Sequence, residues 1–292
     1  MKVLILGGGG MLGHKLVQAL SGSFDVSATL RGDFEKYEKF RLFDKGKVFE
    51  RIDAENEQQL RSVIKNNKPD VVINAIGIIK QIPAAKNVIE TLTINSILPH
   101  KLSELTNEYN FRLITISTDC VFRGEKGNYY ETDISDATDL YGKSKNLGEV
   151  IAGNCLTLRT SIIGRELTGN HSLVEWFLSN RGKKVKGFVN AIYTGFPTIV
   201  FAEIIAAVIS DYPKLQGLYH ISSDPINKYE LLKLINEKFK SGIKIEPETE
   251  FVIDRSLNSS KFRSTTGYAP PDWEKMIEMM ANDPTPYDDW KV

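Results

Sequence analysis

The sequence predicts an α/β fold, a doubly wound parallel sheet of the Rossmann type followed by a smaller α/β C-terminal domain. Short β-branched runs alternate with helical patterns through the first half of the chain, as in right-handed βαβ units. A glycine-rich segment, Gly7–Gly13, directly follows the first apolar run. The second half alternates less regularly. We therefore predict domains over 1–160 and 161–292, with some later segments returning to the first domain.

Hydrophobic periodicity places the elements of the first half. The predicted strands are Val3–Leu6, Val26–Leu30, Val48–Ile52, Val71–Ala75, Leu113–Ser117 and Leu156–Arg159. The predicted helices are Met11–Leu20, Glu57–Asn66, Val88–Asn107 and Tyr141–Ala152. Pro99 is expected to kink the third of these helices, because proline removes a helical hydrogen bond.

The second half gives fewer clear elements. Helices are predicted over Ser172–Asn180, Thr198–Asp211 and Lys228–Lys240, and a strand over Leu218–Ile221. The polar tail Asn282–Val292 is the one segment expected to be disordered.

Composition excludes several classes of protein. Lys plus Arg equals Asp plus Glu, at 37 each, so no basic footprint for nucleic acid is expected. The two cysteines and four histidines form no metal-ligand spacing, and no metal is expected. The longest apolar stretch, Ile199–Ile209, contains Glu203 and is too short to span a bilayer. The N-terminal apolar run is too short for a signal peptide, so we expect a cytoplasmic protein.

The glycine segment lies between a predicted strand and a predicted helix, and it can be matched as GxxGxxG or GxGxxG. Glycines allow a tight turn and close approach to a pyrophosphate, while the helix start offers free N–H groups. A flexible turn without a ligand is the alternative, but the strand and helix context favours dinucleotide binding. The residues expected to contact the dinucleotide here are Gly7, Gly10, Met11, Leu12 and Gly13.

Arg31 occupies the end of the second strand, where NAD-binding proteins usually carry an acidic residue for the ribose diol. A guanidinium can hold a 2′-phosphate with two hydrogen bonds. NADP(H) is therefore the preferred cofactor, with NAD(H) still allowed, since Asp33 lies nearby and Arg31 could be a solvated surface residue. Asp53, after the third strand, is a candidate adenine-side contact or a helix cap.

Tyr141 and Lys145 are spaced four residues apart within a predicted helix, which puts them one turn apart on one face. A nearby ammonium lowers the pKa of a tyrosine from its ordinary value of about 10. The pair then suits proton transfer to a carbonyl oxygen. This spacing also occurs by chance in surface pairs, but the glycine loop upstream makes it more specific.

Thr118 ends the fifth predicted strand. Ligands of doubly wound sheets bind beyond the carboxyl ends of the strands, so the Thr118 hydroxyl is placed to bond a reacting oxygen. A strand-end hydroxyl that caps a turn is the alternative.

Together these motifs resemble the dTDP-4-dehydrorhamnose reductase family of extended short-chain dehydrogenases/reductases. The matching segments are Gly7–Gly13, Asn74-Ala75, Asn95, Ser117–Phe122, Tyr141–Lys145, Leu158–Ser161, Phe196–Thr198, Gly217–His220 and Ser256–Phe262. The resemblance implies a catalytic triad of Thr118, Tyr141 and Lys145, with Lys145 also on the nicotinamide ribose. It further places Ala75, Gly77 and Asn95 at the cofactor.

The resemblance implies an NAD(P)H-dependent reductase of a 4-keto-6-deoxy sugar nucleotide, serving cell-surface polysaccharide precursor synthesis. Its substrate carries a diphosphate, so cations are needed outside the glycine loop. Arg255, Lys261 and Arg263 gather in one segment that matches the family's substrate side, and Arg255 is preferred because its fork can take two oxygens. The alternative is a solvated loop. The expected substrate-binding residues are Lys80, Asp119, Cys120, Arg255 and Lys261.

The chain departs from the family pattern at Cys120, where tyrosine is usual, at Asn258, where aspartate is usual, and over Gly77–Ile82. These changes leave the sugar open, including an N-acetylated hexose on UDP. The competing interpretations are a sugar-nucleotide 4-epimerase, disfavoured by Arg31, and a 4,6-dehydratase, disfavoured because Cys120 replaces the second carboxylate. A non-catalytic NADP-binding regulatory subunit would not need Tyr141 and Lys145. The expected partner is the nucleotide sugar, with a homodimer allowed and neither nucleic acid nor membrane.

Overall fold

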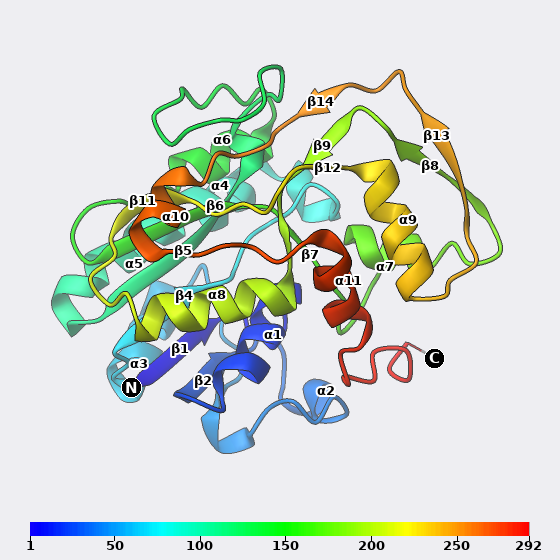
Figure 1. Cartoon of the computed structure of the whole chain (residues 1–292). Coiled ribbons are helices and arrows are strands. Elements are labelled where there is room, and N and C mark those ends of the chain that lie inside the picture. The colour runs from blue at the N-terminus through cyan, green and yellow to red at the C-terminus, as the bar shows by residue number, and fades with distance from the viewer. Residues whose placement is uncertain (292) are drawn as a thin grey trace.

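A wholly parallel seven-stranded sheet forms the centre of the computed structural model, which describes residues 1–291 (Figure 1). Its order is β11-β6-β5-β4-β1-β2-β3. The strands are β1 (Lys2–Leu6), β2 (Asp25–Thr29), β3 (Val48–Phe49), β4 (Val71–Asn74), β5 (Arg112–Thr118), β6 (Cys155–Thr160) and β11 (Gly217–His220). The chain runs from β1 to β2 and β3 on one side and then crosses back to β4 on the other side of β1. This change of direction creates the crevice where such sheets bind ligands. The predicted fold class is confirmed.

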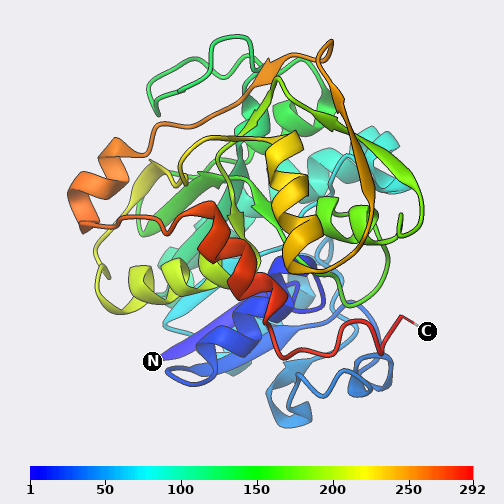
Figure 2. The ribbon, with the colours of Figure 1, turned by 45° about the vertical axis from the view of Figure 1, so that its right-hand side comes forward.

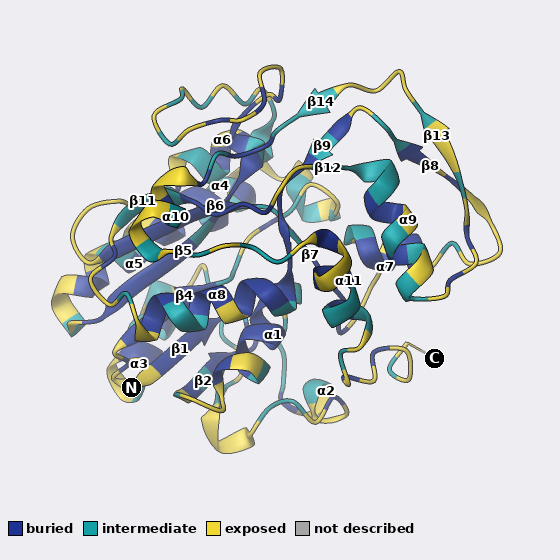
Figure 3. Ribbon diagram, in the orientation of Figure 1, coloured by how far each residue is buried: buried dark blue, intermediate teal, exposed yellow. Residues whose placement is uncertain are grey.

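Alternate residues of the central strands face opposite sides of the sheet, and both sides are apolar. In β1, Val3 and Ile5 join one core cluster, while Leu4 and Leu6 join the other. All four side chains are fully buried, and Figure 3 shows the central strands as the most buried part of the molecule. A strand covered on both faces needs a continuous apolar run. Such runs allow these strands to be predicted from the sequence.

Helices cover both faces of the sheet. On one face, α1 (Met11–Leu20) and α8 (Thr198–Ser210) pack in the first cluster. On the other, α3 (Glu57–Asn67) and α5 (Leu98–Tyr109) pack in the second. Within residues 1–291, no helix has both the length and the apolar character to cross a membrane.

The helix predicted over Val88–Asn107 is confirmed as one continuous helical run. It consists of α4 (Val88–Leu92), a π-helical turn η3 (Thr93–Ile97) and α5. Pro99 lies directly after the π-helical turn, and the predicted kink there stays a prediction. The π-helical turn contains Asn95, which is buried.

The helix α6 (Leu140–Leu147) ends earlier than the predicted Ala152. It is followed by Gly148, where a Cβ atom would lie 1.9 Å from the Asn95 carbonyl oxygen. The close approach of η3 to this glycine therefore sets the position of α6 over the sheet.

The C-terminal half contributes smaller sheets around the strand ends. In them β8 (Lys184–Phe188) pairs with β13 (Lys244–Glu248), β9 (Ala191–Tyr193) with β12 (Ile226–Asn227) and β14 (Ile253–Asp254), and β7 (Ile162–Ile163) with β10 (Phe196–Pro197). The helices here are α7 (Leu173–Leu178), α9 (Lys228–Lys238), α10 (Ser260–Thr266) and α11 (Trp273–Ala281). Since β11 pairs with β6, a late segment completes the central sheet, while the boundary at residue 160 stays a prediction.

The polar tail is ordered, contrary to the prediction of disorder. Residues 282–291 pack beside α1 and the short helix α2 (Glu35–Glu38) (Figure 2). Tyr287 is 2% exposed, and Lys15 pairs with Asp283 through side chains that are both buried. A buried tyrosine and a buried ion pair outweigh the polar composition on which the prediction rested. Val292 lies outside the described residues.

Candidate active site

The glycine loop makes a tight turn between β1 and α1. Gly7 has a φ of +83°, a conformation that favours glycine, and its carbonyl oxygen accepts the Gly10 N–H at 3.0 Å. A Cβ atom on Gly13 would lie 2.0 Å from that same oxygen. The spacing of Gly7, Gly10 and Gly13 therefore follows from the geometry of this turn.

The start of α1 has the donor set of an anion site. Gly10 is its N-cap, no side chain caps it, and its first turn holds no acidic residue. The first-turn N–H groups of Met11, Leu12 and Gly13 thus have no side-chain partner, and the helix dipole adds positive potential there. These residues fit the pyrophosphate of a dinucleotide.

Arg31 lies just past β2, and its side chain is exposed. Among residues 1–291 it forms no hydrogen bond or ion pair, so its guanidinium is available to a ligand. Three carboxylates that follow β2 and β3 in the sequence, those of Asp33, Glu35 and Glu50, have oxygens within 4.8 Å of one another. Asp33 is paired with Arg51, and Glu50 accepts the Phe34 N–H. This exposed cluster is therefore already partly satisfied by the protein.

Asp53 is also exposed, and its carboxylate accepts the Glu55 N–H at 3.0 Å. This hydrogen bond stabilises the turn that precedes α3. The predicted contact of Asp53 with adenine stays a prediction.

Thr118 and Tyr141 come together at the carboxyl end of β5. Thr118 is buried as the last residue of β5, and Tyr141 lies in the first turn of α6. The Thr118 hydroxyl accepts the Cys120 N–H at 3.1 Å and donates to Asp119 at 3.2 Å. It therefore caps the turn after β5, and a rotation of the hydroxyl suffices to turn its proton toward a bound ligand.

Burial raises the pKa of Tyr141 above its ordinary value, and a side-chain hydrogen bond with Thr118 acts in the opposite direction. The sequence led us to expect a lowered pKa from the Lys145 ammonium. That expectation is wrong, because burial has the largest effect on the pKa of Tyr141. Tyr141 consequently stays protonated at neutral pH, which is the form that a proton donor needs.

Lys145 lies one helical turn beyond Tyr141, and its Nζ donates to the Ile116 carbonyl oxygen at 2.7 Å. Burial lowers the pKa of Lys145 to about 8, while the Glu149 carboxylate acts against that change. Glu149 is itself held by Ser117 at 2.6 Å and by a buried ion pair with Arg159. The lysine is thus fixed on the sheet side of α6 and is mainly charged at neutral pH.

Asn95 ties the loop after β4 to α6. Its amide forms two 2.9 Å hydrogen bonds with the backbone of Ile78 and a third, at 3.2 Å, with the Ser144 hydroxyl. Ala75 is half-buried at the end of β4, and Gly77 is exposed beside Asn95. Asn95 therefore positions the wall of the site with its own side chain already satisfied, and direct cofactor contacts of these three residues stay predictions.

Lys80 reaches the ring of Tyr141 from the same loop. Its Nζ lies 2.6 Å from the Asp139 carboxylate and 5.5 Å from the centre of the Tyr141 ring. Asp139 is the N-cap of α6 and accepts the Gly142 N–H at 2.8 Å. Sequence reasoning missed Asp139, although an aspartate just before a helix is a recognised capping signal.

Arg255 is brought to the site by a backbone pairing far along the chain. The Tyr129 N–H donates to the Ser256 carbonyl oxygen at 2.9 Å, and the Asn258 N–H donates to that of Tyr129 at 2.7 Å. Arg255 Nε then donates to the Phe122 carbonyl oxygen at 2.7 Å, and another of its nitrogens lies 3.8 Å from the Cys120 sulfur. The predicted substrate residues Cys120 and Arg255 are therefore neighbours.

Asp119 and Cys120 are both affected by burial. Burial raises the pKa of Asp119, and the positive charge of Arg255 opposes this effect. Burial raises the pKa of the Cys120 thiol to about 11, so the thiol is neutral at physiological pH. Cys120 can therefore contact a ligand but is not an activated nucleophile.

Lys261 and Arg263 lie elsewhere, on α10. Lys261 is exposed, donates to the Leu218 carbonyl oxygen on the edge strand β11 at 2.7 Å and lies over the Tyr219 ring. Arg263 bonds Ser222 and Asp224. Neither contacts the cluster of Thr118 and Tyr141, so of the three predicted cations the structure brings Arg255 alone to it. Substrate binding by Lys261 stays a prediction.

A glycine-loop Rossmann sheet with a Tyr-x-x-x-Lys pair beside the end of β5 defines a short-chain dehydrogenase/reductase. The family model described as RmlD substrate binding domain matches residues 1–285. The chain belongs to this family. The family and the oxidoreductase class predicted from the sequence are confirmed.

The relatives agree along almost the whole chain. A dTDP-4-dehydrorhamnose reductase from Aggregatibacter actinomycetemcomitans is 26% identical, covering 95% of this chain and 97% of the relative. The spore coat polysaccharide biosynthesis protein SpsK from Bacillus subtilis is 29% identical, covering 81% of this chain and 79% of the relative.

The solved structures agree on the fold. The crystal structure of dTDP-4-dehydrorhamnose reductase from Bacillus anthracis in complex with NADP superposes with a TM-score of 0.79 at 22% identity, covering 96% of this chain and 98% of that one. A dTDP-glucose 4,6-dehydratase from the same organism, in complex with NAD, gives 0.80 at 18% identity, covering 100% and 98%. Because enzymes of different activity share this fold, the site residues must decide the chemistry.

Proposed function

We propose that this protein reduces the keto group of a 4-keto-6-deoxy sugar nucleotide, using NADPH in preference to NADH. The observation that supports it most directly is the convergence of Thr118, Tyr141 and Lys145 beside the end of β5, in a family whose named relatives include dTDP-4-dehydrorhamnose reductases. A nicotinamide dinucleotide, when bound, supplies the hydride.

The chain's own residues supply the proton and the orientation. Tyr141 is protonated at neutral pH and donates its phenolic proton to the carbonyl oxygen as that oxygen gains electrons, which leaves a hydroxyl on the sugar. Thr118 donates a hydrogen bond to the same oxygen, and the Lys145 ammonium stabilises the resulting Tyr141 phenolate. Solvent then returns a proton to Tyr141.

The cofactor preference rests on Arg31, whose exposed guanidinium lies past β2 without a protein partner among the described residues. It is supported by the NADP complex of the Bacillus anthracis reductase. The neighbouring carboxylates of Asp33 and Glu50 weigh toward NADH, so the preference is expected to be moderate.

The substrate's diphosphate is assigned to Arg255, since it is the predicted cation that lies beside Cys120. Lys80, paired with Asp139 over the Tyr141 ring, is assigned to the sugar or its phosphate. A 4,6-dehydratase needs a second carboxylate after Asp119, and the neutral Cys120 thiol cannot provide one.

The test is oxidation of NADPH in the presence of a panel of dTDP- and UDP-linked 4-keto-6-deoxy sugars. Consumption of NADPH in step with formation of a 6-deoxy hexose is expected for at least one sugar. Conversion of a 4-hydroxy sugar nucleotide with no net change in NADPH would instead establish an epimerase or a dehydratase. Binding of NADPH without turnover of any sugar would establish the regulatory alternative.

A further inference from the structure

The ordered residues 283–291, here named the C-terminal strap, contact the glycine loop through a buried histidine. The Tyr287 hydroxyl lies 2.8 Å from His14 Nε2, and His14 Nδ1 lies 2.8 Å from the Gly10 carbonyl oxygen. Burial lowers the pKa of His14 to about 4, so the ring is neutral and has one donor nitrogen. A carbonyl oxygen can only accept, hence Nδ1 donates to Gly10 and Nε2 accepts the Tyr287 proton.

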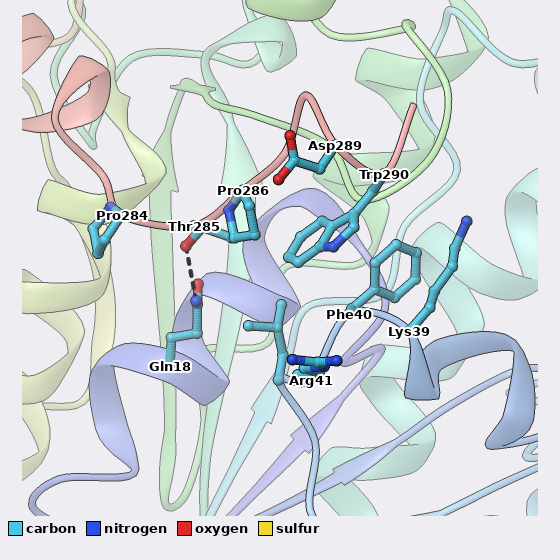
Figure 4. A pocket seen from close by; sticks show the side chains of 10 residues that line it. Gln18, Lys39, Phe40, Arg41, Pro284, Thr285, Pro286, Asp289 and Trp290 are labelled. Atoms are coloured by element: carbon cyan, nitrogen blue, oxygen red, sulfur yellow. Dashed lines mark hydrogen bonds between the residues drawn. The ribbon is translucent and has the colours of Figure 1, made fainter. Parts of the chain in front are cut away.

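A second chain of contacts runs through aromatic rings. The Trp290 and Phe40 ring centres are 4.9 Å apart (Figure 4). The Phe40 and Tyr37 ring centres are 6.3 Å apart. Tyr37 in turn lies against Gly9, where a Cβ atom would come within 2.6 Å of its ring. The strap thus reaches the adjacent loop residues Gly9 and Gly10 through two sets of side chains, which meet where the ring centres of Tyr287 and Trp290 lie 5.7 Å apart.

The strap is anchored to α1 at several points. Lys15 pairs with Asp283 through side chains that are only 5% and 7% exposed, and Gln18 donates to Thr285 at 2.9 Å (Figure 4). A buried ion pair costs far more to break than a surface pair. The strap therefore holds the helix whose N-terminus carries the proposed pyrophosphate site.

The other end of the strap is tied to the C-terminal half of the chain. Asp288 pairs with Arg165, and Lys291 pairs with Glu175 on α7. Two hollows of about 520 Å³ each are lined in part by Trp290. The two ion pairs and the buried Tyr287 side chain therefore hold the strap in place.

We infer that the C-terminal strap positions the dinucleotide site, with Tyr287 acting through His14 and Trp290 acting through Phe40 and Tyr37. The inference rests on the proposed function. Glycines have the most backbone freedom to lose on ordering, so a loop already fixed from behind binds its ligand more tightly. Tyr287 and Trp290 are positioning residues, because neither touches the reacting atoms.

The test compares Tyr287→Phe with wild type by calorimetric titration of NADP⁺ into the full chain. Removing the hydroxyl leaves His14 Nε2 buried without a donor. The expected result is a Kd for NADP⁺ raised about three- to tenfold and faster hydrogen exchange at amides 10–16, with the KM for the nucleotide sugar at saturating NADPH unchanged. The matched control is Tyr212→Phe, which removes a hydroxyl that donates to the Thr266 carbonyl oxygen at 2.5 Å and should leave the Kd as in wild type.

Trp290→Leu tests the second set of contacts and keeps the inference open to refutation should Tyr287→Phe fold poorly. Its Kd for NADP⁺ should also rise. If both variants melt at lower temperature yet bind NADP⁺ as tightly as wild type, the strap is a structural element only and the inference is overturned. If wild-type protein binds neither NADP⁺ nor NAD⁺, the proposed function falls, and the inference falls with it.

Discussion

The proposed cofactor side of the site presents backbone groups, whereas the proposed substrate side presents charged side chains from distant segments. On the cofactor side, Gly7, Gly10 and Gly13 shape one turn, and the sheet fixes where that turn lies. On the substrate side, Arg255 lies beside Cys120 because the segment 256–258 pairs with Tyr129. A site made of backbone groups requires particular residues, such as glycine, at fixed spacing, and can therefore be recognised in the sequence. A site made of side chains depends on how distant loops come together, which the sequence alone does not show.

This contrast predicts where substitutions act. Changes at the end of β5 and the start of α6 should alter the chemical step. Changes on the substrate side should alter substrate KM alone, and changes past β2 should alter cofactor choice alone.

The largest expected effect is on the proton donor, where the two sides meet. Tyr141→Phe keeps the ring and removes the proton, so kcat should fall by roughly 10²–10⁴-fold while NADP⁺ affinity is kept. Steady-state kinetics and a binding titration measure the two quantities. Tyr130→Phe, at an exposed ring, is the control and should behave as wild type. A Tyr141→Phe protein with normal turnover would remove the residue from the chemistry.

The next largest effect is on the pH dependence of kcat/KM, which the protonation of Lys145 is expected to control. The Lys145 ammonium is the active form, and with a pKa of about 8 it loses its proton as pH rises through that value. In the proposed reaction, kcat/KM should therefore be flat near neutrality and fall above about pH 8, approaching tenfold per pH unit.

Glu149→Gln sharpens this prediction, because the Glu149 carboxylate raises the pKa of Lys145. The alkaline limb should move to lower pH in that variant. Since Arg159 loses its buried partner, the profile must be recorded below the melting temperature of the variant. A limb that stays in place in a folded Glu149→Gln protein would assign it to another group.

Arg255 and Lys261 are two cations of one segment, so comparing their variants tests which of them contacts the substrate. Arg255→Ala should raise the KM for the sugar nucleotide about tenfold and leave the Kd for NADP⁺ unchanged, as expected for a charge-assisted contact to phosphate. Lys261→Ala removes a cation of the same segment that lies over Tyr219 instead. If Lys261 also binds the substrate, its variant should raise the KM as well, and an unchanged KM would remove Lys261 from the site.

How much the sequence reveals follows from the same contrast. The strands β1, β4 and β5 were predictable because alternate residues are buried on both faces, which leaves a continuous apolar run. The glycine loop and the spacing of Tyr141 and Lys145 were predictable because local geometry fixes them.

Other features depend on tertiary contacts. The end of α6 at Leu147 is set by the close approach of Asn95 to Gly148, which lies far away in sequence. The C-terminal tail has a polar sequence, yet it is ordered because Tyr287 and Asp283 contact the buried side chains of His14 and Lys15. The raised pKa of Tyr141 follows from its burial. The spacing of Tyr141 and Lys145 along the helix does not predict that burial. In each case the deciding group belongs to another segment of the chain.

The smallest expected effect concerns cofactor choice. The sequence favours NADP(H) because of Arg31, whereas the exposure of Arg31 in the structure predicts only a weak preference. Arg31 stands at the acidic position of NAD-binding proteins, but its side chain is exposed, and the carboxylate cluster of Asp33, Glu35 and Glu50 includes a residue only two positions away in the sequence. An exposed cation gains little from a partner because solvent screens the pair. Arg31→Ala should therefore weaken the binding of NADPH about fivefold and leave the binding of NADH almost unchanged, as measured by titrating both cofactors at low salt.

The control is Arg41→Ala, which removes another exposed arginine of the segment after β2 and should leave both affinities unchanged. The reciprocal variant Asp33→Asn removes a neighbouring negative charge and should strengthen NADPH relative to NADH, an outcome that a purely structural Arg31 would not produce. Equal weakening of both cofactors in Arg31→Ala would show that this residue does not bind the 2′-phosphate.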